Sequence, residues 1–89
     1  MLYFDSKAAL ELFPAQPYLY KMNGLALNKL GKYNEAIDVL TLGIDFVIDN
    51  TVMEADFYEQ LSKSYEGLKQ NSEALKYKQK AADLRNKIK

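Results

Sequence analysis

A pattern of small and apolar residues occurs twice in this chain, and it limits the folds that the chain can form. The first copy is Tyr20, Gly24-Leu-Ala-Leu27, Gly31, Ala36 and Leu40, and the second is Tyr58, Leu61-Ser62, Tyr65, Ala74 and Ala81. Such repetition is typical of stacked helical hairpins, in which each unit buries its apolar face only against its neighbour. We therefore predict an all-α interaction scaffold.

The composition supports a small folded domain and argues against an enzyme. The chain has 89 residues, of which 48% are apolar, so one domain with a modest core can form. It contains neither cysteine nor histidine, which removes thiolate chemistry, disulfides and the commonest metal ligand. Asp45 with Asp49, and Glu59 with Lys63, lie one helical turn apart without a nucleophile or base beside them. Together with Asp56, the two aspartates also lack the spacing of a cation-binding loop. We expect no catalytic residue, no metal site and no cofactor.

Membrane insertion is not expected for this segment. No apolar run approaches the length of about 18 residues that can span a bilayer. Residues 1–5 lack the basic flank and the long apolar core of a signal peptide. We expect a soluble segment, with a cytoplasmic location slightly favoured, although a signal or anchor on a longer parent chain is compatible with the sequence.

Periodicity and capping signals divide the chain into about five helices, and no segment alternates with period two over the length of a strand. The expected helices cover about residues 2–12, 17–30, 33–47 and 51–68, followed by a last helix after the polar break at 69–72. Pro14 ends the first helix, Pro17 favours the start of the second, and Gly31 permits a tight turn after it.

The start of the fourth helix carries a specific signal. Thr51-Val-Met-Glu54 fits a capping box, in which the threonine hydroxyl accepts from the backbone of the third residue and Glu54 reaches back. Thr51 is therefore the predicted N-cap, and its replacement by alanine is expected to cost about 1 kcal/mol.

Apolar residues at three- and four-residue steps predict the buried faces of these helices. The predicted core residues are Ala36, Ile37, Leu40, Ile44, Val47, Phe57, Tyr58, Leu61, Tyr65, Ala74, Leu75, Tyr77, Ala81, Leu84 and Ile88. Most aromatic residues fall on packing positions, so they indicate a core and not a ligand pocket.

Set against a 34-residue helix-turn-helix period, these residues resemble the tetratricopeptide repeat. The resemblance assigns residues 17–50 and 51–89 to two repeats and residues 1–16 to the second helix of a truncated one. The small residues Gly24, Ser62, Ala36 and Ala74 take positions at which two helices cross closely, where a larger side chain would cost about 1–3 kcal/mol.

This chain also departs from the family pattern. Asn23, Gly43, Ile48 and Lys78 stand where the family has leucine, alanine, proline and an aromatic residue. The matched positions lie 38 residues apart, as in Tyr20 and Tyr58, which is four more than the family period. One extra helical turn at residues 51–54 would absorb the insertion without changing the stacking.

The resemblance implies a right-handed superhelix whose concave face binds a protein or peptide segment. Carried over by position, the groove residues are Tyr18, Lys21, Met22, Leu25, Asn28 and Lys29 from one helix, and Asp56, Glu59, Gln60, Lys63 and Glu66 from the next. The first set is apolar and basic, and the second is mostly acidic. A partner with an apolar anchor and some charge would suit such a groove.

One branch of the family, which holds a C-terminal carboxylate, is a poor match. Lys21 takes the lysine position of that branch, but Leu25 stands where it has asparagine. Asp56 and Glu59 would in addition repel an anionic tail. Lys21 and Lys29 are equally well explained as solvated helix charges.

Two alternatives to this function remain open at this point. The chain can be an ordinary helical bundle with a structural or oligomerisation role. It can be a weak nucleic-acid binder through the basic residues of the last helix, Lys76, Lys78, Lys80, Arg85, Lys87 and Lys89, although these face several directions and nucleic acid is not the expected partner. Because residues 1–16 lack their partner helix, self-association through Leu2, Tyr3, Phe4, Leu10 and Phe13 is also expected, as is membership of a longer array.

Overall fold

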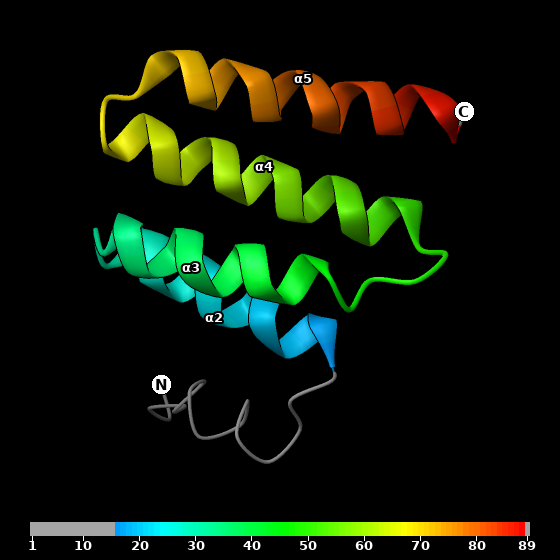
Figure 1. Cartoon of the computed structure of the whole chain (residues 1–89), viewed down its shortest axis with the longest axis horizontal. Coiled ribbons are helices and arrows are strands. Elements are labelled where there is room, and N and C mark those ends of the chain that lie inside the picture. The colour runs from blue at the N-terminus through cyan, green and yellow to red at the C-terminus, as the bar shows by residue number, and fades with distance from the viewer. Residues whose placement is uncertain (1–15, 89) are drawn as a thin grey trace.

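In the computed structural model, residues 16–88 are described, and they contain four α-helices and no strand. The helices are α2 (Pro17–Lys29), α3 (Tyr33–Ile44), α4 (Thr51–Gly67) and α5 (Asn71–Lys87). Consecutive helices run antiparallel, and α4 lies between α5 and the α2–α3 pair (Figure 1). The predicted all-α class is confirmed. The helix expected at residues 2–12 lies outside the described residues.

Tight turns with the same hydrogen bonds end α2 and α4. After α2 the amides of Gly31 and Lys32 donate to the carbonyls of Asn28 and Leu27, at 3.0 and 2.9 Å. After α4 the corresponding bonds run from Lys69 to Glu66 and from Gln70 to Tyr65, both at 2.9 Å. Gly31 has φ +76° and Lys69 has φ +61°, which is the left-handed geometry that closes a helix. Each of these positions recurs 38 residues later.

α4 begins with four residues that have no counterpart in α2. α4 has 17 residues and α2 has 13, a difference of four. The last residues of the two helices, Lys29 and Gly67, are 38 apart, so the excess lies at the N-terminal end of α4. It covers residues 51–54, which is one helical turn.

The N-cap of α4 is Asn50, and the prediction of Thr51 was wrong. The Asn50 Oδ1 accepts a hydrogen bond from the Met53 amide at 3.0 Å, whereas Thr51 is the first helical residue. The capping-box spacing from Thr51 to Glu54 indicated the wrong residue because Asn50 and Thr51 are adjacent and both residue types are favourable N-caps. The residue whose backbone leaves helical geometry decides which of them caps the helix.

A second boundary also differs from the prediction, because α3 ends at Ile44 and not at Val47. The amides of Phe46 and Val47 donate to the carbonyls of Gly43 and Ile44 at 3.0 and 3.1 Å. Such bonds to the third preceding residue tighten a chain end and stop the α-helical ladder.

The core lies where α4 packs on α2 and α3. Its buried members are Tyr20, Ala36, Leu40, Phe57 and Leu61, and the partly buried residues packed on them include Ile37, Ile44, Val47, Tyr58, Tyr65 and Tyr77. The predicted faces of α3 and α4 are therefore confirmed. On α5 only part of the prediction holds: Ala74 and Ala81 are buried, but Leu75 and Ile88 are 66% and 48% exposed. No described helix covers the side of α5 on which Leu75 lies.

Close approach at the small residues explains how the hairpins pack. A Cβ on Gly24 would overlap the Leu40 side chain, and one on Gly43 would overlap Tyr20 and lie 2.9 Å from Phe57 Cε1. In the second hairpin the Ser62 hydroxyl donates to the Ala74 carbonyl at 2.7 Å, so α4 and α5 also touch directly. The positions that the sequence marked as small are therefore those at which the helices meet.

Candidate functional site

The eleven predicted groove residues lie on α2 and α4, and we call the surface they form the α2–α4 strip. Their exposure varies along it. Tyr18, Met22, Lys29, Lys63 and Glu66 are exposed, whereas Lys21, Leu25, Asn28, Asp56, Glu59 and Gln60 are half-buried. Most of the half-buried residues make polar contacts with another helix. These contacts connect the helices that form the strip.

Three pairs of polar residues join the helices across the strip. Lys21 Nζ lies 3.4 Å from Asp56 Oδ2, and Asn28 Nδ2 donates to the Gln60 backbone carbonyl at 3.1 Å and to its side chain at 3.2 Å. The Ser64 hydroxyl donates to Asn28 Oδ1 at 2.6 Å. The structure therefore brings together Lys21 with Asp56 and Asn28 with Gln60. Lys21 and Asn28 of α2 therefore both bind side chains or backbone of α4.

Arg85 extends this network to α5. Its guanidinium nitrogens lie 3.0 Å from Asp56 Oδ1 and 2.7 Å from Glu59 Oε2. Asp56 is consequently shared between Lys21 and Arg85, so its charge is compensated from two helices. Glu59 also lies 4.0 Å from Lys63, one turn further along α4. The mostly acidic character expected for the α4 half of the strip is largely neutralised at its centre.

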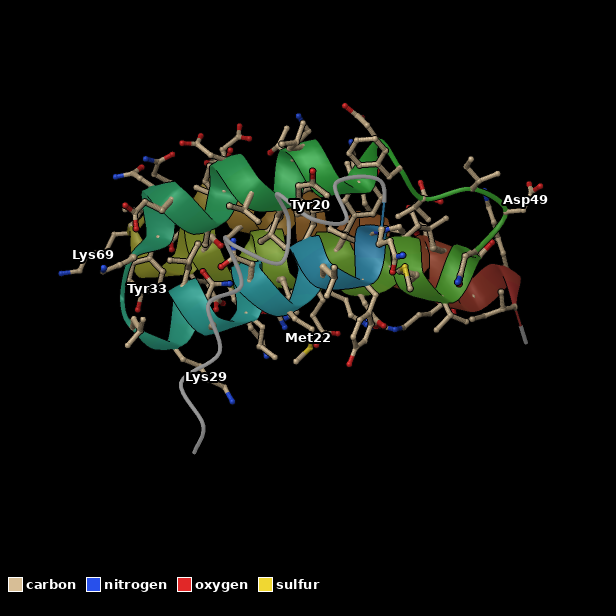
Figure 2. All side chains as sticks on the ribbon, turned by 90° about the horizontal axis from the view of Figure 1, so that it is seen from below. Tyr20, Met22, Lys29, Tyr33, Asp49 and Lys69 are labelled. Carbon is tan, nitrogen blue, oxygen red and sulfur yellow. The ribbon has the colours of Figure 1, made fainter. Side chains whose placement is uncertain are left out.

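An apolar patch remains exposed at the α2 side of the strip. Tyr18 is 53% exposed and Met22 is 39% exposed. Met22 points away from the other helices (Figure 2). Lys21 Nζ lies 5.7 Å from the centre of the Tyr18 ring, so this ring is next to a cation as well as to solvent. Large side chains of this kind are suitable anchors for a protein partner.

A cavity of about 500 Å³ opens between α4 and α5. Its lining residues are Glu59, Ser62, Lys63, Glu66, Lys78, Ala81, Ala82, Arg85 and Asn86. Three of them, Glu59, Lys63 and Glu66, belong to the strip. The cavity therefore extends the strip sideways onto α5, with alanine methyl groups at its floor and both signs of charge around it.

The basic residues of α5 are distributed over different surroundings. Arg85 binds carboxylates of α4, and Lys78 lines the cavity. Lys80 Nζ lies 5.3 Å from the ring centres of both Tyr58 and Tyr77, and Lys76 Nζ lies 5.7 Å from that of Tyr77. Lys89 lies outside the described residues. Since these cations point to the cavity, to the carboxylates and to the aromatic rings, they do not form one stripe along a helix face.

Three tyrosines form a stack where α4 meets α5. Tyr77 lies 5.8 Å from Tyr58 and 5.5 Å from Tyr65, measured between ring centres. Burial raises the pKa of Tyr58 and of Tyr65 above the ordinary tyrosine value, and nearby negative charge, from Glu54 at Tyr58, adds to it. These phenols remain protonated at neutral pH and act as packing groups.

The described residues contain neither a metal-binding cluster nor a membrane-spanning helix. Within residues 16–88, no group of three or more acidic side chains is placed to hold a metal ion, and this includes the Asp45, Asp49 and Asp56 set. None of the four described helices is both long and apolar enough to cross a membrane.

Comparison with protein-family models, with curated proteins and with solved structures finds no match to this chain. Its function must therefore be argued from its own residues.

Sequence reasoning missed four residues that shape this surface: Ser64, Lys78, Ala82 and Arg85. Arg85 was outside the predicted groove because the groove residues were carried over by position from α2 and α4 only, whereas Ser64 lies on α4 at a position that was not carried over. The 38-residue offset could have found the α5 residues, since Ala82 corresponds to Ile44 at the end of α3 and Arg85 to Val47 just after it, and both of these residues pack on the core. Polar or small residues at the positions of core residues indicate a surface that no described helix covers.

Proposed function

We propose that this chain is a non-catalytic protein-interaction module of the tetratricopeptide-repeat type, which binds a protein or peptide segment on the α2–α4 strip. The repeat assignment is supported by two helix-turn-helix units with the same turn hydrogen bonds at a constant offset. Right-handed superhelical stacking, with the strip on its concave side, belongs to this proposal.

One observation carries the binding function: exposed apolar side chains lie beside a surface whose charges are fixed by contacts between helices. Lys21 and Asp56 hold α2 against α4, so Tyr18 and Met22 project from a rigid platform. A preorganised surface loses little conformational entropy on binding, which favours affinity. Exposed aromatic and methionine side chains supply apolar area for a partner's anchor residue.

The chemistry of the strip also specifies the kind of segment. Lys29, Lys63 and Glu66 are exposed at one end, whereas Tyr18 and Met22 lie toward the start of α2. We expect a bound segment with an apolar anchor over Met22 and charged residues further along. Since the central charges already neutralise each other, a purely anionic or purely cationic segment would gain little there.

The test is selection from a displayed library of peptides, followed by affinity measurement by fluorescence anisotropy. Met22→Glu should weaken the selected peptides by about tenfold or more, because it places a charge at the apolar anchor. Leu75→Glu, at an exposed apolar position of α5 away from the strip, is the matched control and should leave affinity unchanged. Absence of enriched peptides, or equal losses with both variants, would contradict the proposal.

A further inference from the structure

α4 rests on a seat formed by α2 and α3. Three contacts define it: the Lys21–Asp56 ion pair at 3.4 Å, the Asn28–Gln60 hydrogen bond at 3.1 Å, and the contact between Gly43 and Phe57. Leu40 and Phe57 are fully buried in the core that forms there. The seat is therefore a helix-binding surface that this protein already uses internally.

The cavity between α4 and α5 is a second copy of that seat. Adding 38 to Lys21, Asn28 and Gly43 gives Glu59, Glu66 and Ala81, and all three line the cavity. The other lining residues correspond to Gly24, Leu25, Leu40, Ile44, Val47 and Ile48 by the same offset. Every residue of the lining therefore has its counterpart in α2, in α3, or at Val47 and Ile48, which follow α3. No helix of residues 16–88 lies on this second seat (Figure 1).

The two seats occupy corresponding positions of the two hairpins but differ in chemistry. Leu25 and Leu40 of the first seat are replaced by Lys63 and Lys78 in the second. Among the described residues, Lys78 makes no ion pair within 4.0 Å, and the only such neighbour of Lys63 is Glu59. Ala81 and Ala82 keep part of the lining small and apolar, as close packing requires. The lining carries three basic side chains, Lys63, Lys78 and Arg85, and two acidic ones, Glu59 and Glu66. Because Arg85 pairs with Glu59 at 2.7 Å, a helix lying there would meet Lys63 and Lys78 beside the alanines, and Glu66 further along α4.

We propose that the second seat binds an amphipathic α-helix of a partner protein, with carboxylates facing Lys63 and Lys78 and an apolar ridge that packs on Ala81 and Ala82. This deepens the proposed function and rests on it in part, because Glu59, Lys63 and Glu66 belong to both surfaces. Recognition is of the helix-in-groove kind, in which residues three and four apart supply the contacts.

A second copy of this chain is a poorer occupant. Its α2 would present the residues that correspond to the contact face of α4. These are Tyr18, Leu19, Met22, Ala26 and Leu30. That stripe carries no carboxylate, so Lys63 and Lys78 would lose water without gaining a partner. Charge complementarity favours an acidic helix instead.

The chain itself provides a probe. A fluorescein-labelled peptide of residues 50–68 reproduces α4, the helix that fills the first seat, and it carries four acidic residues against one lysine. An isolated helix of this length is marginal in water, so ordering it on the protein will reduce affinity. We expect saturable binding to the full chain in fluorescence anisotropy, and none by a scrambled peptide of equal composition.

Charge reversal tests the site. Lys78→Glu should weaken the probe by about tenfold, because it removes one attraction and adds a repulsion. Lys76→Glu is the matched control: it makes the same change on the same helix, but on the side of the tyrosine stack, and should change affinity by less than about twofold. Equal affinities for the two variants would overturn the proposal, as would the absence of binding at about 1 mM peptide.

Steric blocking gives a second, independent readout. Ala82→Glu places a long anionic side chain on the floor and should abolish probe binding, whereas Ala26→Glu, at an exposed alanine of α2, should not. Circular dichroism establishes that each variant is folded. If the protein alone self-associates in sedimentation velocity and Ala82→Glu abolishes this, the occupant is a second copy and the proposal is wrong.

The two proposals can fail separately. Met22→Glu should weaken peptides selected for the α2–α4 strip and leave the acidic probe unaffected. Lys78→Glu should weaken binding of the acidic probe and leave binding of the selected peptides unaffected. Loss of the probe with Met22→Glu alone would place helix binding on α2 and overturn the assignment to the second seat.

Discussion

At the scale of single residues, close contact and backbone geometry determine which substitutions the fold tolerates. Gly43 is buried between Tyr20 and Phe57, and no space remains for a side chain. The equivalent residue of the second hairpin, Ala81, lies at the floor of the cavity, with α4 on one side. The same repeat position is therefore more crowded in the first hairpin because α4 covers it.

Gly43→Ala should destabilise the protein by about 1–3 kcal/mol through overpacking, despite the better helix propensity of alanine. The new Cβ would overlap Tyr20 and lie 2.9 Å from Phe57 Cε1, and both of these side chains are buried in the core. Urea denaturation followed by circular dichroism measures the loss. An unchanged or higher midpoint would show that α2 and α4 can separate without cost.

Lys69→Gly should stabilise the protein by about 1 kcal/mol, because a left-handed backbone is strained for lysine and not for glycine. Lys69 and Gly31 occupy the same turn position, with φ +61° and +76°. The reverse change, Gly31→Lys, is the matched control and should lower the thermal midpoint. A loss of stability with Lys69→Gly would mean that its side chain contributes more than the turn strain costs.

At the scale of elements, α4 joins the two hairpins, and its first turn distinguishes it from α2. The additional turn moves the N-cap back to Asn50, which leaves residues 45–50 to connect α3 to α4. Asp49 in this connection also has a positive φ, of 49°, and lies at the opposite end of the molecule from Lys69 (Figure 2).

Asn50→Ala should lower stability by about 1 kcal/mol, since it removes the acceptor for the Met53 amide. Thr51→Ala should have an effect of only a few tenths of a kcal/mol, because Thr51 is the first helical residue and does not cap. Thermal unfolding of the two variants side by side decides between the caps. A larger loss with Thr51→Ala would restore the capping box.

Alkaline pH should loosen the contact between α4 and α5. The raised pKa values of Tyr58 and Tyr65 mean that the folded state holds these protons more tightly than the unfolded state. Their contribution to stability is therefore complete below the ordinary tyrosine pKa of about 10 and decreases as the pH rises through the folded values.

Urea midpoints at about pH 8 and pH 10.5 should differ more for the wild-type protein than for the Tyr58→Phe, Tyr65→Phe double variant. Lysine titration is common to both proteins and cancels in the comparison. Equal pH dependence would show that these phenols titrate alike in the folded and unfolded states.

At the scale of the whole molecule, one core holds both hairpins together, and Phe57 contributes to it from α4. It is fully buried with Leu40 and contacts the backbone position of Gly43. A small domain has a total stability of about 5–10 kcal/mol, so loss of one such side chain removes a large part of it.

Phe57→Ala should cost about 3–5 kcal/mol and leave the chain largely unfolded at physiological temperature. Leu75→Ala, at a position that is 66% exposed, is the control and should change stability by less than about 0.5 kcal/mol. Chemical denaturation measures both. Similar midpoints would mean that the two hairpins fold independently of each other.

The sequence alone predicted much of the architecture. The 3.6-residue periodicity indicated an all-α fold, and Gly24 and Ser62, which the sequence marked as small packing positions, lie where helices touch. These features are local or periodic, so residue order determines them directly. Self-association through residues 1–16 stays a prediction, since these residues lie almost entirely outside the described part of the chain.

Only the tertiary structure decided which charged side chains form ion pairs and which apolar side chains stay exposed to solvent. Lys21 and Arg85 lie 35 and 29 residues from Asp56 in the chain, and no periodicity brings them to the same carboxylate. Leu75 has the chemistry of a core residue but remains exposed, because the described helices pack elsewhere. The sequence determined the faces of the helices, whereas packing determined the partners of those faces, since contacts between distant segments depend on how whole helices dock.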